Sequence, residues 1–168
     1  TDLDLDGDVD ILATSRANDK VVWYENDGAG SFTYNLISGS TDGASDVYAA
    51  DLDNDGDIDI VSASSNDNTI AWYENDGAAD PTFTEHEITT SAGGASSVFT
   101  IDLDRDGDVD IISAEPNDDK VIWYRNDGAP NPSFVTVGLN YNIKLPKDIF
   151  AVDMNNDGFI DVVTAGSN

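Results

Sequence analysis

The chain has no cysteine, one histidine, one methionine and only seven lysine and arginine residues among its 168 positions. Without cysteine there is no disulfide framework, and the redox compartment cannot be inferred. A zinc site is disfavoured, because zinc prefers nitrogen and sulfur ligands and His86 is the only histidine or cysteine. No apolar run approaches the length of a membrane helix, and no signal peptide is visible.

Positive charge is scarce, while aspartate and glutamate together number 34, which gives a formal net charge of −27. Nucleic acid and anionic membrane surfaces would repel such a chain. We therefore expect no nucleic-acid binding and no membrane insertion. The length leaves room for one ordinary domain with a core. Because the chain begins at Thr1 without methionine, we expect it to be processed or truncated.

One nine-residue pattern organises the sequence, with a carboxylate at almost every odd position and glycine at the sixth. Its second copy reads Asp51-Leu52-Asp53-Asn54-Asp55-Gly56-Asp57-Ile58-Asp59, and the four copies begin at Asp2, Asp51, Asp102 and Asp153. Two unit charges ~5 Å apart repel by roughly 3 kcal/mol at an effective dielectric of about 20. A bound hard cation would remove this penalty.

Calcium suits these loops best, since it accepts six to eight oxygen ligands at irregular angles. By analogy with the EF-hand, positions 1, 3 and 5 would supply side-chain oxygens and position 7 a backbone carbonyl. Position 12 is Ala13, Ser62, Ser113 or Thr164 instead of glutamate, so position 9 must supply the closing ligand. We predict about four Ca²⁺ ions, one per loop, held by Asp2, Asp4, Asp6, Asp8, Asp10, Asp51, Asp53, Asp55, Asp57, Asp59, Asp102, Asp104, Asp106, Asp108, Asp110, Asp153, Asn155, Asp157, Phe159 and Asp161.

The alternative is that the loops are turns without metal, because aspartate, asparagine and glycine favour turns in any case. Turn chemistry alone does not require a carboxylate at alternate positions in four successive copies. The metal interpretation is therefore preferred.

The loops belong to a longer repeat. Residues 2–28 align without gaps to residues 51–77 and to residues 102–128, and the only length difference falls just before Phe32, Phe83 and Phe134. Such an insertion is typical of an exposed hairpin turn. We predict a single region over residues 1–168, with repeats of approximately 1–45, 46–96, 97–147 and 148–168. The first and last repeats are incomplete.

Each period contains four short strand-like runs separated by turn signals. In the second period they are residues 46–50, 59–64, 69–74 and 83–89. No window has a convincing helical period, so the predicted fold is all-β. Four strands in ~50 residues, repeated, predict a β-propeller of four-stranded antiparallel blades, with about 3.5 blades in this chain. It would be a partial propeller or one completed by other chain segments, whereas a β-sandwich would not explain so regular a repeat.

Aromatic residues recur at fixed positions of the repeat. The pairs Trp23-Tyr24, Trp72-Tyr73 and Trp123-Tyr124 fit blade packing, although exposed members could bind sugars. Tyr48, Phe99 and Phe150 are expected in the core. His86 lies between two glutamates on an outer, polar strand and is expected to be solvated.

The loop motif, followed by Ile, Val or Leu and by Trp-Tyr-Glu-Asn-Asp-Gly some 21 residues after its start, resembles the FG-GAP/VCBS repeat family over essentially the whole chain. That family includes calcium-binding blades of integrin α-subunits, a fungal propeller lectin and many secreted or surface proteins of bacteria. The resemblance implies seven-bladed propellers with calcium between the first two strands of a blade. The fourth copy departs at Asn155 and Phe159, which implies lower charge and the weakest site.

We therefore expect a calcium-binding extracellular module, secreted or at the cell surface, that serves adhesion, recognition or surface architecture, with calcium in a structural role. The alternative is a carbohydrate-binding lectin with sites between blades. A polysaccharide-active enzyme is less supported, because almost every aspartate belongs to a repeated motif and the non-repeated Glu115 and Lys144 do not form a site. Expected partners are glycans or other surface proteins. Because open blade edges are sticky, we also expect a longer parent chain or a homo-oligomer.

Overall fold

The computed structural model describes residues 1–140 and 143–167. Thirteen strands account for the regular structure: β1 (Ile11–Ser15), β2 (Lys20–Asn26), β3 (Phe32–Ser38), β4 (Ala44–Ala50), β5 (Asp59–Ser64), β6 (Thr69–Asn75), β7 (Phe83–Thr89), β8 (Ser97–Ile101), β9 (Asp110–Glu115), β10 (Lys120–Asn126), β11 (Phe134–Asn140), β12 (Pro146–Val152) and β13 (Asp161–Gly166). Within the described residues the only helical element is a 3₁₀ turn, Pro116–Asp118. None of the described helices could cross a membrane. The all-β prediction is confirmed.

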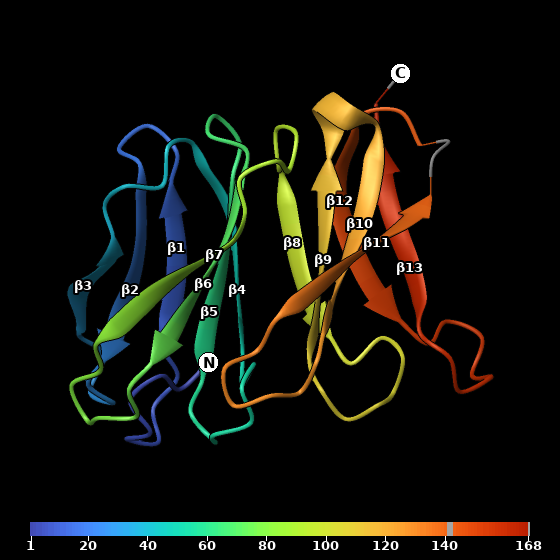
Figure 1. Cartoon of the computed structure of the whole chain (residues 1–168). Coiled ribbons are helices and arrows are strands. Elements are labelled where there is room, and N and C mark those ends of the chain that lie inside the picture. Colours follow the sequence, from blue (N-terminus) through green and yellow to red (C-terminus); the bar gives the residue numbers. More distant parts are fainter. Residues whose placement is uncertain (141–142, 168) are drawn as a thin grey trace.

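The strands form four antiparallel sheets that stand side by side (Figure 1). Blade 1 contains β1 to β3, blade 2 contains β4 to β7, blade 3 contains β8 to β11, and blade 4 contains β12 and β13. In every blade each strand pairs with its neighbour in the chain, so the blades are simple meanders. This is the propeller-like arrangement that the repeat predicts.

The central strands are buried on both faces, because every inner blade is covered by a blade on each side. All six residues of β5 are buried, and so are all six of β9. The outer strands β3 and β7 are half-buried or exposed along most of their length. The Ile60-Val61 and Ile111-Ile112 pairs, which follow the second and third acidic loops, therefore form the interior of the stack.

Three hydrophobic clusters hold the blades together, one at each contact between consecutive blades. Between blades 1 and 2, Leu3 and Trp23 pack with Ile60 and Tyr73. Burying one such side chain contributes about 1.5–3 kcal/mol, so the stack depends on contacts between blades as well as within them. A blade alone would leave both of its apolar faces in water.

The Trp-Tyr pairs do serve this packing, as predicted. Trp23, Trp72, Tyr73 and Tyr124 are buried, and the other members of the pairs are half-buried.

The prediction that Tyr48, Phe99 and Phe150 all lie in the core is wrong for two of them. Phe99 is buried, but Tyr48 and Phe150 are exposed. Their rings form a ladder across the first strands of blades 2, 3 and 4, with centroid distances of 4.7 Å and 5.2 Å. Phe99 is covered because it has a ring on each side. The two outer rings have a neighbour on one side only.

The expectation that His86 is merely solvated is also wrong. Its ring stacks on Trp72 with centroids 4.5 Å apart, and its Nε2 lies 2.8 Å from Oε2 of Glu74. These contacts follow from the register, because His86 on β7 lies directly opposite Trp72 on β6.

Candidate metal centre

The four acidic loops lie at one end of the blades, in the lower part of Figure 1. Loop 1 (residues 2–10) precedes β1, loop 2 (51–59) joins β4 to β5, loop 3 (102–110) joins β8 to β9, and loop 4 (153–161) joins β12 to β13. In blades 2, 3 and 4 the loop therefore lies between the first and second strands, where the family resemblance places calcium.

Backbone conformation sets the shape of each loop. In loop 2, Gly56 at the sixth position has φ +100° and Asn54 at the fourth has φ +61°. Positive φ is readily adopted by glycine and is tolerated by asparagine. The fourth position of the other loops is Leu5, Arg105 or Asn156, each with φ between 58° and 65°. The loop thus folds back on itself, which brings its alternate side chains together.

The folded loop directs its backbone N–H groups at its own carboxylates. Gly56 N donates to Asp51 Oδ2 at 3.2 Å, and Asp55 N donates to Asp53 Oδ1 at 3.2 Å. Each bond fixes one oxygen of a carboxylate and leaves the second oxygen available. In Asp51 and Asp53 this second oxygen is the candidate ligand.

The aspartate at position 9 closes the loop and is the most buried aspartate in each of loops 1 to 3. Asp59 Oδ1 accepts from Asn75 N at 2.9 Å and Oδ2 accepts from Leu52 N at 3.0 Å. Burial raises the pKa of Asp59 to about 7 and also raises the pKa of Asp110, the equivalent residue in loop 3. A nearby cation would oppose this effect and favour the charged carboxylates.

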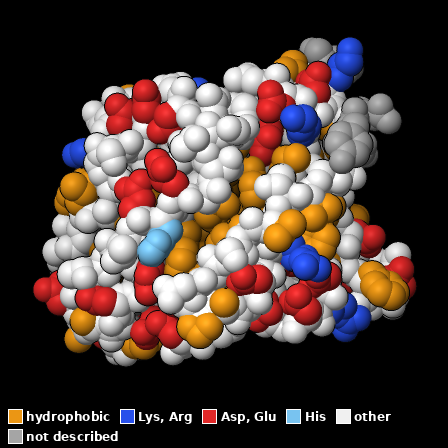
Figure 2. All heavy atoms as spheres, viewed as in Figure 1, with side chains coloured by type: hydrophobic (Ala, Val, Ile, Leu, Met, Phe, Trp, Pro, Cys, Tyr) orange, Lys and Arg blue, Asp and Glu red, His pale blue; other side chains and the backbone are white. Residues whose placement is uncertain are grey.

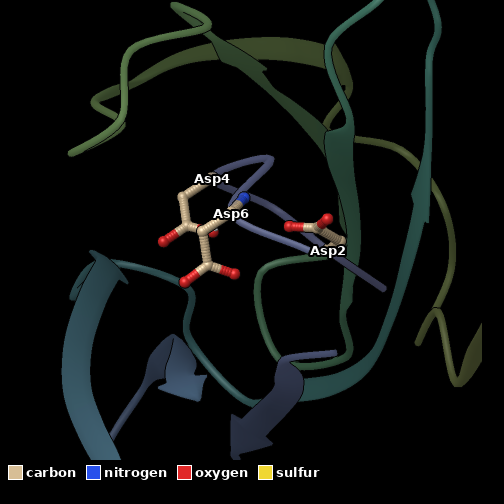
Figure 3. A group of neighbouring side chains, drawn as sticks. All are labelled: Asp2, Asp4 and Asp6. Atoms are coloured by element: carbon tan, nitrogen blue, oxygen red, sulfur yellow. The ribbon is translucent and has the colours of Figure 1, made fainter. Parts of the chain in front are cut away.

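Carboxylate oxygens converge in three of the loops. In each of these loops, one oxygen from each of three aspartates lies within 4.8 Å of the others: Asp2, Asp4 and Asp6 in loop 1; Asp51, Asp53 and Asp59 in loop 2; Asp102, Asp104 and Asp110 in loop 3. Figure 3 shows the loop 1 group, with the carboxylates of Asp4 and Asp6 close together and that of Asp2 directed toward them. Sequence reasoning predicted all nine residues.

A single atom in each of these loops is poorly satisfied. Oδ1 of the first aspartate, in Asp2, Asp51 and Asp102, is buried and has no hydrogen-bond donor. Leaving a buried carboxylate oxygen unpaired is costly. An all-oxygen donor set of this kind fits calcium, which binds carboxylates and backbone carbonyls at irregular angles.

The side chains at position 7 turn away from this group. Those of Asp8, Asp57 and Asp108 lie against Gly28, Gly77 and Gly128, where an added Cβ would overlap the carboxylate. These glycines also have positive φ, between 64° and 67°. The prediction that position 7 uses its backbone carbonyl is compatible with this orientation. Gly28, Gly77 and Gly128 lie in the turns that follow β2, β6 and β10. The sequence of the acidic loops alone does not predict that these turns need glycine.

Sequence reasoning also missed two asparagines that join neighbouring loops. Asn75, at the end of β6, donates from Nδ2 to Ile58 O of its own loop and to Leu3 O of loop 1, both at 3.0 Å. The sequence signal is the asparagine that follows each Trp-Tyr pair by two residues.

Asn126 repeats this arrangement one blade later. Its Nδ2 donates to Val109 O at 3.0 Å and to Leu52 O of loop 2 at 2.7 Å. Its backbone N donates to Asp110 Oδ1 at 2.9 Å. The buried side-chain amide of Asn126 therefore fixes position 2 of one loop and position 8 of the next, and its backbone N–H fixes position 9.

The polar side-chain atoms of loop 4 have different hydrogen-bond partners from those of the other loops. Asp153 Oδ1 accepts from Asp157 N at 3.2 Å, so the oxygen that is orphaned in the other loops has a donor here. Asn155 Nδ2 donates to Asp157 Oδ2 at 3.0 Å, and Phe159 at position 7 is exposed. The predicted fourth ion stays a prediction.

Comparison with known proteins agrees with this geometry. No curated protein matches the chain. A family model described as an FG-GAP-like repeat matches three overlapping segments, residues 2–62, 51–113 and 102–164. Each match begins at the first aspartate of a loop and ends just beyond the next loop. The chain therefore belongs to the FG-GAP-like repeat family.

Proposed function

We propose that the chain is a calcium-stabilised β-propeller module of a secreted or cell-surface protein, acting in adhesion, recognition or surface architecture. The observation that carries the proposal is the orphaned, buried Oδ1 of Asp2, Asp51 and Asp102. The same unpaired oxygen at the same position of three loops supports a positively charged ligand at each of them. Calcium, when bound, supplies that positive charge.

The residues divide the work between binding and orientation. In loop 2, Asp51, Asp53 and Asp59 would hold the ion, and the backbone of Gly56 and Leu52 orients two of these carboxylates. Because the same loop also joins β4 to β5, an ion held there would stiffen the connection between the first two strands. The role we propose for calcium is therefore structural.

The expected stabilisation is large compared with the margin of a domain. A site with a dissociation constant near 10⁻⁴ M, in ~10 mM calcium, would stabilise the folded state by about 2.7 kcal/mol. Total stabilities are typically about 5–15 kcal/mol. Sites of this strength fill at the millimolar calcium concentrations of extracellular fluids, which supports the proposed location.

A non-catalytic role fits the distribution of acidic groups. Most belong to the repeated loops, and the non-repeated Glu115 is buried, where Oε1 accepts from Tyr124 Oη at 2.7 Å and from Ser113 Oγ at 2.9 Å. Burial raises the pKa of Glu115. It acts within the fold as a hydrogen-bond acceptor, without access to a substrate.

Calorimetric titration of calcium into chelator-stripped protein tests the proposal. We expect at least three ions per chain, with the fourth site weakest. Asp51→Asn should remove one site, whereas Asp76→Asn, in an exposed turn outside the loops, should leave the stoichiometry unchanged. A stoichiometry of zero or one would refute the calcium role.

A second candidate function, glycan recognition, is favoured by one feature. A groove of about 300 Å³ runs between blades 2 and 3, lined by Trp72, His86, Glu87, Ile88 and residues 131–134. Figure 2 shows hydrophobic side chains in the hollow beside the single histidine. An apolar floor with a few polar groups at its rim is typical of small-ligand sites.

Glycan-array binding with and without calcium tests this second function. Glu87→Ala, at the exposed rim of the groove, should reduce binding, whereas Glu25→Ala on β2 of blade 1 should not. If neither form of the protein retains any glycan, the groove is only a packing feature.

A further inference from the structure

A pocket of about 550 Å³ lies at the end of the blades opposite the acidic loops, toward the top of Figure 1. Its volume falls within the roughly 300–1,000 Å³ of small-ligand sites. All four blades contribute to its lining, through the turns that follow β1, β5 and β9 and through the segments that begin β4, β8 and β12.

The charge of this lining is the reverse of the charge of the whole chain. The chain has 34 acidic and seven basic residues. Among the described residues that line the pocket, Arg16 and Lys147 are basic and none is acidic or aromatic. The groove beside Trp72, by contrast, has an apolar floor. The pocket therefore favours a negatively charged, strongly polar ligand over a neutral sugar that stacks on a ring.

Both basic residues depart from the repeat. The other repeats carry serine or proline at these positions: Ser65 and Pro116 in place of Arg16, and Ser45 and Ser96 in place of Lys147. All six residues line the pocket. The repeat can pack without a basic residue at either position, so packing of the blades does not account for Arg16 and Lys147.

Arg16 reaches the pocket from the inner side of blade 1. Leu12, on β1, packs against the hydrophobic cluster between blades 1 and 2. Side chains two residues apart lie on the same face of a strand. Thr14 therefore also faces blade 2, and Arg16 follows in the same direction just past the end of β1, where both line the pocket with Ser65 of blade 2.

Lys147 reaches the pocket from the inner side of blade 4. It lies at a bulge of β12, between Pro146 and Asp148, and a bulge redirects the side chain that it contains. Its carbonyl accepts from Ser96 Oγ of blade 3 at 3.0 Å, so the residue lies against blade 3. The outer faces of blades 1 and 4 therefore take no part in the pocket.

The pocket contains side-chain donors that lack acceptors. The Thr14 hydroxyl, the Arg16 guanidinium, the Asn117 amide and the Lys147 ammonium donate to no acceptor among the described residues. The three serine hydroxyls are already in use, because each donates to a backbone carbonyl, at 2.7 Å, 3.1 Å and 3.0 Å. A ligand that satisfies the four remaining donors must bring acceptor oxygens, and charged oxygens bind such donors most strongly.

The aspartates of the adjoining turns and strands have other partners. Each accepts a hydrogen bond or forms an ion pair outside the pocket lining or with its framework, as in Asp19, Asp42, Asp67, Asp118, Asp119 and Asp148. The acidic loops are farther away, since the six residues of β5 span ~20 Å. This is more than twice the ~8 Å over which physiological salt screens exposed charges.

We propose that this pocket binds a small polar dianion whose two carboxylate or sulfate groups contact Arg16 and Lys147. The guanidinium fork matches the oxygens of such a group in pairs, and the ammonium binds one as a point charge. Thr14 and Asn117 donate to the remaining oxygens. A long polyanion is disfavoured, because the net charge of −27 repels it over the rest of the surface.

Calorimetric titration of the full chain in about 0.15 M salt tests the proposal with three probes. They are a disaccharide of a uronic acid and a sulfated amino sugar, inorganic sulfate, and lactose. We expect the acidic disaccharide to bind and lactose not to bind. Weaker binding of sulfate identifies an acidic sugar as the ligand, and equal binding identifies a free oxyanion; both support the pocket. Absence of binding by both anions up to about 10 mM overturns the proposal.

Three substitutions locate the binding. Arg16→Gln and Lys147→Gln should each weaken binding of the disaccharide at least tenfold. Lys144→Gln is the matched control, because it removes the same charge from an exposed lysine that does not line the pocket. Equal weakening by all three variants overturns the proposal, since net charge alone would then explain the binding. Weakening by only one pocket variant overturns the contact at two points.

Calcium titration of the same variants separates this inference from the proposed function, which it goes beyond. The calcium stoichiometry of Arg16→Gln and Lys147→Gln should equal that of the unmodified chain. A chain that binds calcium but neither anion contradicts only the anion pocket, and a chain that binds the disaccharide but no calcium contradicts only the calcium role. Glu87→Ala, in the groove beside Trp72, should leave anion binding unchanged.

Discussion

Loops 2 and 4 have almost the same sequence pattern, yet they satisfy their polar atoms in different ways. In loop 2, Oδ1 of Asp51 is buried without a donor, and Asp59 is buried between two backbone N–H groups. In loop 4, the equivalent oxygen of Asp153 accepts from Asp157 N, and the Asn155 amide donates to the Asp157 carboxylate. Loop 2 leaves this oxygen of its first aspartate unpaired, whereas loop 4 pairs it with a backbone N–H of the same loop.

The difference comes partly from the strands beside each loop. Asp59 accepts from Asn75 at the end of β6, the third strand of its blade. Among the described residues, blade 4 contains β12 and β13, and Asp161 has no equivalent of the Asn75 contact. An acidic motif is therefore stronger evidence for a metal where the surrounding strands bury it and leave an oxygen unpaired.

Removal of calcium should have the largest effect, because it acts on loops 1 to 3 together. At about 2.7 kcal/mol per filled site, and roughly 2–4 °C per kcal/mol for a chain of this size, chelator should lower the melting temperature by more than roughly 10 °C. Circular dichroism melts measure this, and re-added calcium should restore stability. An unchanged melting curve would show that the loops are turns without metal.

Substitution of the aspartate at position 9 should show the clearest difference in stability loss between loops 2 and 4. In loop 2, Asp59→Ala removes a buried acceptor of two N–H groups, and we expect a loss of about 3–5 kcal/mol. In loop 4, Asp161→Ala should cost only about 1 kcal/mol, since Asp161 is less buried. Urea unfolding in calcium compares the two variants, and equal losses would contradict the difference in burial between Asp59 and Asp161.

Loss of the linking asparagine should affect two loops at once. Asn126→Ala leaves the carbonyls of Leu52 and Val109 without their donor, at an expected cost of about 2–3 kcal/mol. Calcium affinity should fall in both loop 2 and loop 3. Asn26→Ala, which breaks one such bond, is the control and should cost about 1 kcal/mol. A change confined to loop 3 would show that Asn126 does not connect the loops.

The smallest effect is expected from a substitution that makes loop 4 more like loop 2. Asn155→Asp removes the internal amide donor and adds a carboxylate at position 3, so loop 4 should bind calcium roughly tenfold more tightly, a gain of about 1.4 kcal/mol. Calorimetric titration resolves this as a change in the weakest site. Unchanged affinity would contradict a weakening effect of Asn155 on the loop.

The sequence by itself determined the architecture to a large extent. The predicted strands at residues 59–64 and 83–89 coincide with β5 and β7, and the runs at 46–50 and 69–74 fall within β4 and β6. This accuracy has a physical basis. Each repeat has the same alternation of apolar and polar residues and the same Asn, Asp and Gly turn signals. The strands recognised in one repeat therefore predict those in the others. The spacing of carboxylates within nine residues likewise predicted aspartates that converge in loops 1 to 3, because the loop that joins them is local.

Only the tertiary structure decided properties that depend on a neighbouring blade. Tyr48 and Phe99 occupy equivalent positions, yet one is exposed and the other buried, because only Phe99 has a ring on both sides. The contact of Asn126 with Leu52 joins residues 74 positions apart, and no local pattern encodes it. Burial and hydrogen bonding at a given position of the repeat are set by what packs beside it, and that differs between the middle of the stack and its ends.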